Sequence, residues 1–412
     1  MQPLPDLFGA DALAPADLNG PDRPDDLLRQ KRRGHDGHVS SIWSFPGSGG
    51  RQLYRWYGTL PRPLVERVFE VFDPGDGTFV DGFSGTGVSL DVANDFGMTA
   101  LGYDTNPLAC LIAEARLRGL PPTRSVMEDV ARVSAKAKQP GPPSESWTIG
   151  VQSDDFSYSR KWFRDDTLVA VLKLLEAVSE VKDARTQRYF FVALAQVVRD
   201  VASVDARCTH HYVRKEKPFV DPVPLWAKRV RDNVGVVRPA PLASESARVV
   251  QASFQSAEPS ESADLLLLHP PYLGVIHYNL IHRLATDLLG IAQEVRRPVS
   301  LSGLDFSHAN IKAEDMSTDN GKKYSLTLKD VASAADRMLK EDGTCIVIIG
   351  DQRHKGFLRH PFTDIVVEFE SLGMMMKEMF IWVLQNNGGM HIKRKGHFID
   401  HNYIMAFSRQ RS

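Results

Sequence analysis

The sequence predicts an α/β protein with a mostly parallel sheet, an antiparallel edge and a helical insertion. A strand, a glycine loop, a helix, a second strand and an acid follow one another over residues 78–104, which is the order that opens a nucleotide-binding βαβ arrangement. An apolar run at 265–268 stops at two prolines, and apolar residues recur at helical spacing over 166–201. The 412 residues suffice for one large α/β domain with an insertion.

The elements are expected in a definite order after a flexible tail at residues 1–34, whose prolines and aspartates leave few apolar side chains to offset ordering. Prolines and glycines at the ends of periodic segments set the boundaries. The expected helices are 64–72, 88–96, 166–181, 186–201, 281–289, 326–339 and 363–372. The expected strands are 78–80, 99–103, 249–253, 262–268, 344–349, 377–384 and 403–407, of which the last two form the antiparallel edge.

Composition narrows the functional classes. The net charge of -1 gives no overall attraction to nucleic acid, although local basic runs can contact phosphates. Cys110, Cys208 and Cys345 are far apart and lack zinc-type spacing, which predicts a reducing cytoplasm and no metal. No signal peptide and no apolar run of roughly 20 residues is visible, so no membrane association is expected.

The glycine loop over residues 81–87 has the residue types that a nucleoside-containing ligand needs. Gly85 and Gly87 let the backbone approach a ligand without a Cβ clash, and the following helix offers free N–H groups. Asp104 is placed to accept hydrogen bonds from two ribose hydroxyls. Leu90 stands where a dinucleotide motif needs Gly or Ala, so the loop favours a ligand without a pyrophosphate. The alternative is a tight βα turn with a surface aspartate.

The segment His269-Pro270-Pro271-Tyr272 follows the apolar run at 265–268. Two prolines cannot continue a strand ladder, and they fix the local backbone. The Pro270 carbonyl and the His269 side chain could accept both hydrogen bonds of an exocyclic amino group, which would direct the nitrogen lone pair at an electrophilic methyl group. Tyr272 would stack on the base. The alternative is a plain turn at the end of a strand.

These motifs resemble those of the DNA amino-methyltransferases that use S-adenosylmethionine and act on N4 of cytosine or N6 of adenine. The resemblance rests on DGFSGTG, GYDTNPLA and HPPY after DLLLL, with YRWYGTL, TCIVIIGD and GHFIDHNYIMAF as further matches, and covers most of residues 51–408. It implies a Rossmann-like, seven-stranded methyltransferase sheet. The order of cofactor motif, insertion and catalytic motif is similar to the subclass whose target-recognition region lies between the two motifs.

The candidate site residues fall into three groups, and no metal ligand is expected. The catalytic group is His269, Pro270, Pro271 and Tyr272. The cofactor-binding group is Tyr57, Leu60, Asp81, Phe83, Ser84, Gly85, Thr86, Gly87, Asp104, Thr105, Asn106 and Ser253. The DNA-binding group comes from the basic runs and comprises Arg207, His210, His211, Arg214, Lys215, Lys217, Lys393 and Arg394.

A stretch rich in Pro, Gly and Ser at 136–146 marks a domain boundary. After the tail, residues 35–140 are expected to form the cofactor-binding first half of the catalytic domain. Residues 141–245 form the helical insertion, a candidate target-recognition region, and residues 246–412 form the second half.

The sequence departs from the family pattern at two places. His269 stands where the family has Asp, Asn or Ser; a neutral imidazole can accept one hydrogen bond and a protonated one cannot, so activity is expected to require neutral His269. The strand at 249–253 lacks the acid that often holds the adenine amino group of the cofactor, and Gln251 or Ser253 is the candidate substitute.

The sequence therefore predicts a cytoplasmic methyltransferase that flips a base out of double-stranded DNA and methylates its exocyclic amino group. N4 of cytosine is favoured, because the HPPY form with the amino-end segment resembles the cytosine group more than the adenine group. N6-adenine methylation, RNA methylation and a catalytically inactive DNA-binding module are the alternatives. A cognate restriction or defence partner is a candidate partner.

Overall fold

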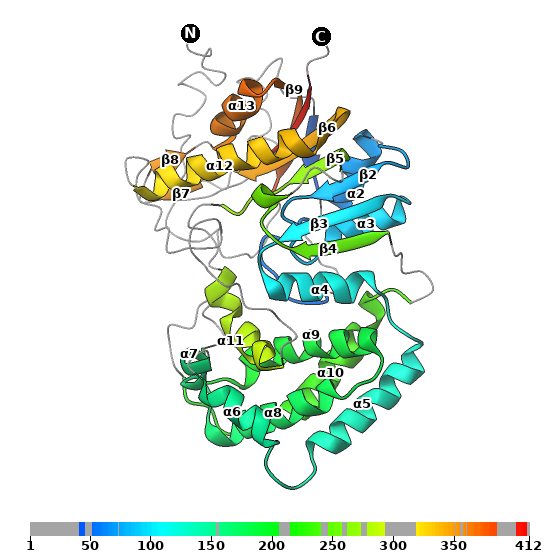
Figure 1. Cartoon of the computed structure of the whole chain (residues 1–412), viewed down its shortest axis with the longest axis vertical. Helices are drawn as coiled ribbons and strands as arrows, with labels where there is room; N and C mark the ends of the chain where they lie inside the picture. Colours follow the sequence, from blue (N-terminus) through cyan, green and yellow to red (C-terminus); the bar gives the residue numbers. More distant parts are fainter. Residues whose placement is uncertain are drawn as a thin grey trace.

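The computed structural model describes residues 41–45, 52–72, 74–153, 156–205, 215–239, 246–257, 262–272, 278–292, 319–350, 352–354, 357–359, 361–384 and 401–409. The predicted tail at 1–34 lies outside these residues. An eight-stranded sheet with helices on both faces forms one part of the molecule, and a helical layer lies beside α4 (Pro107–Leu117) (Figure 1).

The sheet has the strand order β1-β9-β10-β6-β5-β2-β3-β4. Every neighbouring pair is parallel except the two pairs of β10, which runs antiparallel to β6 and β9. A second, two-stranded sheet pairs β7 (Gln352–His354) with β8 (Phe357–Arg359). The predicted fold class is therefore confirmed, including the antiparallel pairing of the last two strands. The strands of the large sheet are β1 (Ser41–Ser44), β2 (Thr78–Asp81), β3 (Thr99–Asp104), β4 (Ala247–Gln251), β5 (Ala263–Leu268), β6 (Leu339–Gly350), β9 (Met374–Val383) and β10 (His401–Arg409).

Strand β1 adds an eighth member to the seven predicted strands. It pairs in parallel with β9, and Trp43 packs against Phe380 with ring centroids 4.5 Å apart. Its four residues are too few to show a periodicity in the sequence. The pairing depends on a contact with a strand more than 300 residues later in the chain, as the range Met374–Val383 of β9 shows.

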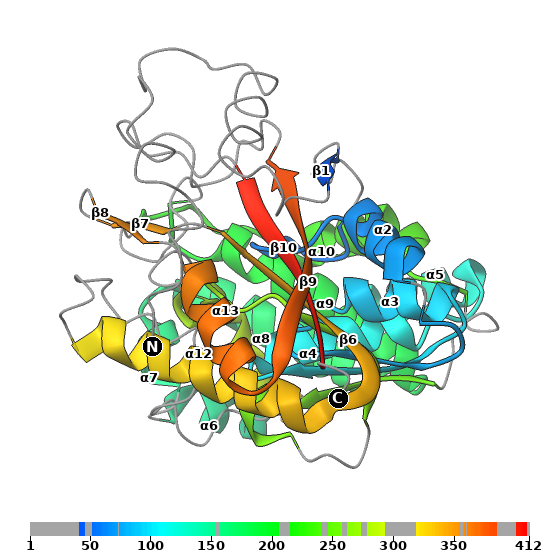
Figure 2. The ribbon, with the colours of Figure 1, turned by 90° about the horizontal axis from the view of Figure 1, so that it is seen from above.

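Helices cover both faces of the sheet (Figure 2). Helices α12 (Asp319–Met338) and α13 (Pro361–Ser371) pack on the face that carries Leu266 and Leu268 of β5. Helices α2 (Arg62–Phe72) and α3 (Val88–Asp95) pack on the opposite face, with Leu265 and Leu267. Strand β5 is thus buried on both faces, which explains why its sequence is an unbroken apolar run rather than an alternating one.

A third core joins α4 to the helical layer (Figure 1). It contains side chains from Leu53, before the glycine loop, to Leu289 in α11 after the HPPY segment. Helix α4 was not predicted, because burial on nearly every side removes its periodicity, although Asn106 and Pro107 form a clear start signal.

The predicted boundary at 136–146 contains the connection between α5 and α6. The remaining helices are α5 (Thr123–Ala137), α6 (Glu145–Gln152), α7 (Ser157–Arg160), α8 (Asp165–Ser179), α9 (Ala184–Val201), α10 (Pro222–Asn233) and α11 (Tyr278–Ile291).

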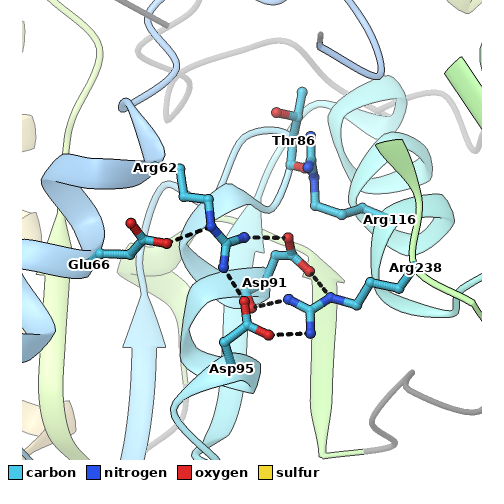
Figure 3. Close-up of polar contacts among 7 residues, drawn as sticks. All are labelled: Arg62, Glu66, Thr86, Asp91, Asp95, Arg116 and Arg238. Atoms are coloured by element: carbon cyan, nitrogen blue, oxygen red, sulfur yellow. Dashed lines mark hydrogen bonds and ion pairs between the residues drawn. The ribbon is translucent and has the colours of Figure 1, made fainter. Parts of the chain in front are cut away.

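An ion-pair network holds α3, the helix that follows the glycine loop (Figure 3). Arg62 Nη1 lies 2.9 Å from Asp91 Oδ2, and Arg238 Nε lies 2.7 Å from Asp91 Oδ1. Both arginines also pair with Asp95. The Asp91 side chain is only 11% exposed, so removing either guanidinium group would leave a mostly buried carboxylate with one fewer cationic partner. The network therefore connects α2, α3 and the segment that follows α10.

Replacing Arg238 with alanine is expected to lower the free energy of unfolding by about 2 kcal/mol, because the mostly buried Asp91 loses one of its two cationic partners. Urea unfolding followed by circular dichroism measures the change. The control is Arg124→Ala, which removes an exposed pair with Glu128 and should change the value by less than about 0.5 kcal/mol. Equal losses in the two variants would contradict a stabilising role for the network.

No helix in the described part of the chain has both the length and the apolar character needed to cross a membrane.

Candidate active site

The two motifs singled out in the sequence lie at the same edge of the sheet. Strand β2 leads into the glycine loop and β5 leads into His269, and these strands are parallel neighbours with Asp81 opposite Leu267. The Gly82 N–H donates to the Leu267 carbonyl at 3.0 Å. A Cβ at Gly82 would lie 2.6 Å from Leu268 Cδ2, so glycine permits this close approach. The loop and the HPPY segment thus begin side by side.

The glycine loop uses left-handed backbone at two positions. Gly85 has φ +51° and Gly87 has φ +75°, a region that residues with a Cβ avoid. A Cβ at Gly87 would lie 2.8 Å from the Ala113 Cβ of α4. Among the described neighbours of Gly85, a Cβ would meet Trp56 Nε1 alone within 4 Å, at 3.8 Å, so a ligand has room to approach the backbone there.

Replacing Gly87 with alanine is expected to lower the free energy of unfolding by about 2–4 kcal/mol, because left-handed strain adds to overpacking against α4. The control is Gly97→Ala. Gly97 has nearly the same φ, +78°, but a Cβ at this position would meet none of the described residues within 4 Å, so about 1 kcal/mol of strain is expected there. Denaturant unfolding compares the two, and equal effects would show that the contact with α4 is unimportant.

The Asp104 carboxylate is held at the end of β3 by two backbone donors. The Gly85 N–H donates to Oδ2 at 2.9 Å and the Asn106 N–H donates to Oδ1 at 2.7 Å. Asn106 in turn caps α4, because its Oδ1 accepts from the N–H groups of Leu108 and Ala109 at 3.0 and 3.4 Å. Each carboxylate oxygen can accept more than one hydrogen bond. Half-buried Asp104 is thus oriented to accept further hydrogen bonds from a ligand.

Asp81 has a different environment from Asp104. It is 3% exposed, and its carboxylate accepts from the Phe83 N–H at 2.8 Å and from the Ser89 hydroxyl. Burial raises the pKa of Asp81 to about 6 because it disfavours the charged form. Buried Asp81 therefore stabilises the turn of the glycine loop through its hydrogen bonds to Phe83 and Ser89.

The other candidate cofactor residues follow neighbouring strands. The Ser84 N–H donates to the Tyr103 carbonyl at 2.9 Å, and half-buried Phe83 lies against Phe254 with ring centroids 6.4 Å apart. Ser253 comes two residues after Gln251, which is opposite Asp104 in the sheet. Thr86 is buried, and its carbonyl accepts from Arg116 Nε at 2.9 Å (Figure 3). Thr105 is half-buried directly after Asp104.

Leu60 and Tyr57 lie on the segment before α2. The Leu60 side chain is 8% exposed and packs in the core beneath α2 and α3. The Tyr57 carbonyl accepts a hydrogen bond of 2.9 Å from the hydroxyl of Tyr278 in α11. The segment before the first helix is thus joined to the helix that follows the HPPY segment.

An aromatic stack that the sequence interpretation missed lies next to these residues. The Trp56 ring stacks on His282 with centroids 4.2 Å apart and on Tyr278 with centroids 5.6 Å apart. Burial, with Asp104 nearby, raises the pKa of Tyr278. Tyr278 and His282 are four residues apart on α11, which is the spacing of one helix face. That spacing was the available sequence signal, but it does not reveal that the face meets Trp56.

His269 and Tyr272 lie against the start of β10. The Tyr272 hydroxyl donates to Asn402 Oδ1 at 2.9 Å and lies 3.3 Å from His269 Nε2. Burial lowers the pKa of His269 to about 4, because the imidazolium form loses hydration. His269 is therefore neutral at pH 7. Pro270 is buried, and Pro271 is half-buried.

Most of the candidate DNA contacts lie outside the described residues. These are Arg207, His210, His211, Arg214, Lys393 and Arg394. Lys215 and Lys217 are described: the Lys215 N–H donates to the Ser203 carbonyl and Lys217 Nζ donates to the Asp200 carbonyl, each at 3.1 Å. The DNA-binding group thus stays a prediction. Across the described ranges no cluster of three or more His, Cys, Asp or Glu side chains could hold a metal ion.

Three solved structures match this chain at low sequence identity. A TehB-like SAM-dependent methyltransferase from Corynebacterium glutamicum has 10% sequence identity and a TM-score of 0.31, over 84% of this chain and 87% of that one. TrmN from Thermus thermophilus has 7% identity and a TM-score of 0.32, over 86% and 50%. The glycopeptide N-methyltransferase MtfA has 7% identity and a TM-score of 0.29, over 85% and 95%.

Sequence comparison finds a family match in the carboxyl-terminal part of the chain. No curated protein matches the sequence significantly. A family model described as DNA methylase matches residues 263–412, which include the HPPY segment and the strands β5, β6, β9 and β10. The predicted resemblance to the DNA amino-methyltransferases is confirmed over residues 263–412 by this match.

Proposed function

We propose that this protein transfers a methyl group from S-adenosylmethionine to the exocyclic amino nitrogen of a base flipped out of duplex DNA. N4 of cytosine is the favoured target and N6 of adenine is the alternative. The observation that supports the proposal most directly is the adjacency of β2 and β5, which places the glycine loop and the HPPY segment at one edge of the sheet. Ligands of open α/β sheets bind beyond the carboxyl ends of strands at such an edge.

The residues after β2, β3 and β4 fit S-adenosylmethionine, which supplies an electrophilic methyl group on sulfur. Asp104 has two oriented carboxylate oxygens for the ribose hydroxyls. Gly85 leaves its backbone accessible, and Phe83 with Ser253 can border the adenine. We therefore assign the cofactor to the space above the glycine loop and the ends of β3 and β4.

The HPPY segment would hold the target amino group. The Pro270 carbonyl and neutral His269 each accept one of its N–H groups, which localises the nitrogen lone pair for bond formation. The methylated nitrogen then releases one proton to water. Extruding the base costs a few kcal/mol, which contacts in the pocket would offset. Catalysis in this scheme comes mainly from positioning.

Methyl transfer from radiolabelled cofactor tests the proposal directly. The full chain is incubated with duplex DNA or with structured RNA, and DNA from cells expressing the protein is analysed by nucleoside mass spectrometry. N4-methylcytosine is the expected product, and N6-methyladenine would support the alternative target. Label that enters RNA alone would overturn the DNA assignment. Cofactor binding without transfer to either nucleic acid would favour an inactive DNA-binding module.

We also propose how the protein contacts DNA, what the four predicted regions of the chain do and where in the cell the reaction takes place. The basic segment at 207–217 would contact the DNA backbone, and residues 141–245 would contribute to target recognition. We place the reaction in the cytoplasm, with a cognate restriction or defence protein as partner. Replacing Arg207, Arg214 and Lys215 together should weaken DNA binding and reduce its salt dependence.

The pH dependence of transfer should reflect the environment of His269. Because burial lowers its pKa to about 4, the imidazole remains an acceptor at pH 7 and loses that ability only as the pH falls toward 4. The profile of kcat/KM should therefore lack a histidine step near pH 6.5, the ordinary value. As the pH falls from about 6.5 to about 4, His269 is protonated in the unfolded chain but not yet in the folded protein. The free energy of unfolding therefore decreases over this range as the pH falls.

A comparison with His269→Asn separates His269 from Asp81, whose pKa is raised to about 6. A step near pH 6 that persists in His269→Asn belongs to another group such as Asp81. A step near pH 6.5 that disappears in the variant would contradict the neutral state of half-buried His269.

A further inference from the structure

Three strands place their end residues together beside the HPPY segment. His269 follows β5, Gly350 ends β6, and Asn402 is the second residue of β10 and lies opposite Gly350 in the sheet. The Tyr272 hydroxyl lies between His269 Nε2, at 3.3 Å, and Asn402 Oδ1, at 2.9 Å. The three side chains form a continuous hydrogen-bonded chain that ends inside the sheet.

The packing around Asn402 stabilises the hydrogen bonds that join His269, Tyr272 and Asn402. Asn402 is 4% exposed. A Cβ at Gly350 would overlap Asn402 Oδ1 and would lie 3.4 Å from Tyr272 Cε2, so the absence of a side chain at Gly350 makes room for both groups. Glycine at position 350 therefore permits the buried amide to place its oxygen 2.9 Å from the tyrosine hydroxyl.

The single proton of the Tyr272 hydroxyl determines which atoms donate and which accept in these two hydrogen bonds. A tyrosine hydroxyl has one proton, and here it is donated to Asn402 Oδ1. Tyr272 Oη can then only accept from His269, so Nε2 must carry the imidazole proton. Since burial keeps the ring neutral at pH 7, with a pKa of about 4, Nδ1 is left with its lone pair.

We propose that Tyr272 and Asn402 are positioning residues that hold His269 in the Nε2–H tautomer, so that Nδ1 accepts a hydrogen bond from the target amino group. This inference rests on the proposed function for its substrate. Asp, Asn and Ser, which the family has at the position of His269, accept hydrogen bonds without a choice of tautomer. A histidine there accepts only if the proton is kept on the other nitrogen.

The tautomer can be measured without any substrate. The full chain labelled with ¹⁵N-histidine is studied by long-range ¹H–¹⁵N correlation at pH 7, and the His269 signals are identified by their loss in His269→Asn. We expect a protonated Nε2 and an unprotonated Nδ1, and a mixture of tautomers in Tyr272→Phe. A proton on Nδ1, or an unchanged tautomer in Tyr272→Phe, overturns the proposal.

Kinetics separate the positioning role from stacking. Tyr272→Phe keeps the aromatic ring, so stacking alone predicts an unchanged rate, whereas loss of the hydroxyl should lower kcat about tenfold with the same KM for the cofactor. Asn402→Leu removes the acceptor oxygen and should lose the Nε2–H tautomer. Asn402→Asp keeps an acceptor oxygen and should retain this tautomer. Tyr189→Phe is the control, because it removes a buried hydroxyl that donates to the Val230 carbonyl in the helical layer. It should change neither readout.

The two measurements fail in different ways. A protein that transfers no methyl group to DNA but shows the expected tautomer and its loss in Tyr272→Phe would refute the proposed substrate and leave the hydrogen-bonded chain intact. An active enzyme whose tautomer and kcat are both unaffected by Tyr272→Phe would refute the positioning role alone.

Discussion

Replacing Asp104 with alanine is expected to weaken S-adenosylmethionine binding roughly 100-fold or more. Hydrogen bonds to a charged acceptor contribute about 1.5–3 kcal/mol each, and the variant loses those to both ribose hydroxyls. It also releases the Gly85 N–H, which donates to Asp104 Oδ2 at 2.9 Å, and the Asn106 N–H at 2.7 Å. The ligand site and the shape of the glycine loop are therefore affected together. Isothermal titration calorimetry measures the dissociation constant.

The matched control is Asp104→Asn, which keeps one acceptor oxygen in nearly the same volume. It should weaken binding less than the alanine variant, about tenfold, since one strong acceptor is kept. Urea unfolding of all three proteins shows whether the loop change alters stability. If Asp104→Ala binds the cofactor as tightly as the natural sequence does, the ribose assignment is wrong.

Replacing His269 with alanine is expected to lower kcat by about 100- to 1000-fold, the usual effect of removing one oriented polar group from a reacting centre. Cofactor affinity should not change, because the candidate cofactor residues precede α2 or follow β2, β3 and β4, whereas His269 follows β5. The Pro270 carbonyl would then be the one remaining acceptor for the amino group. Single-turnover transfer with saturating cofactor measures the loss.

The comparison variant is His269→Asn, which supplies an amide oxygen as acceptor and needs no tautomer. It should retain kcat within about tenfold of the natural enzyme, since one neutral hydrogen bond replaces another. Full activity in His269→Ala would contradict a role for the side chain and would leave the backbone of the HPPY segment as the only means of holding the amino group.

Local sequence patterns were sufficient for the parts of the fold that depend on neighbouring residues. The apolar run Leu265–Leu268 predicted a strand, and β5 is a strand whose two faces are both buried. Gly85 and Gly87 predicted a tight loop, and both have positive φ values. Each of these properties follows from steric limits or burial within a few residues, so it can be recognised before the chain is folded.

The sequence by itself thus determined the α/β class, the glycine loop with Asp104 after it, and the rigid turn at Pro270 and Pro271. Only the tertiary structure decided that β1 joins β9, that Tyr278 and His282 meet Trp56, and that Tyr272 is bonded to Asn402. The physical reason is that these contacts join segments more than 100 residues apart, as Tyr272 and Asn402 are. The neutral state of His269 has the same origin, because burial by the whole fold sets its pKa.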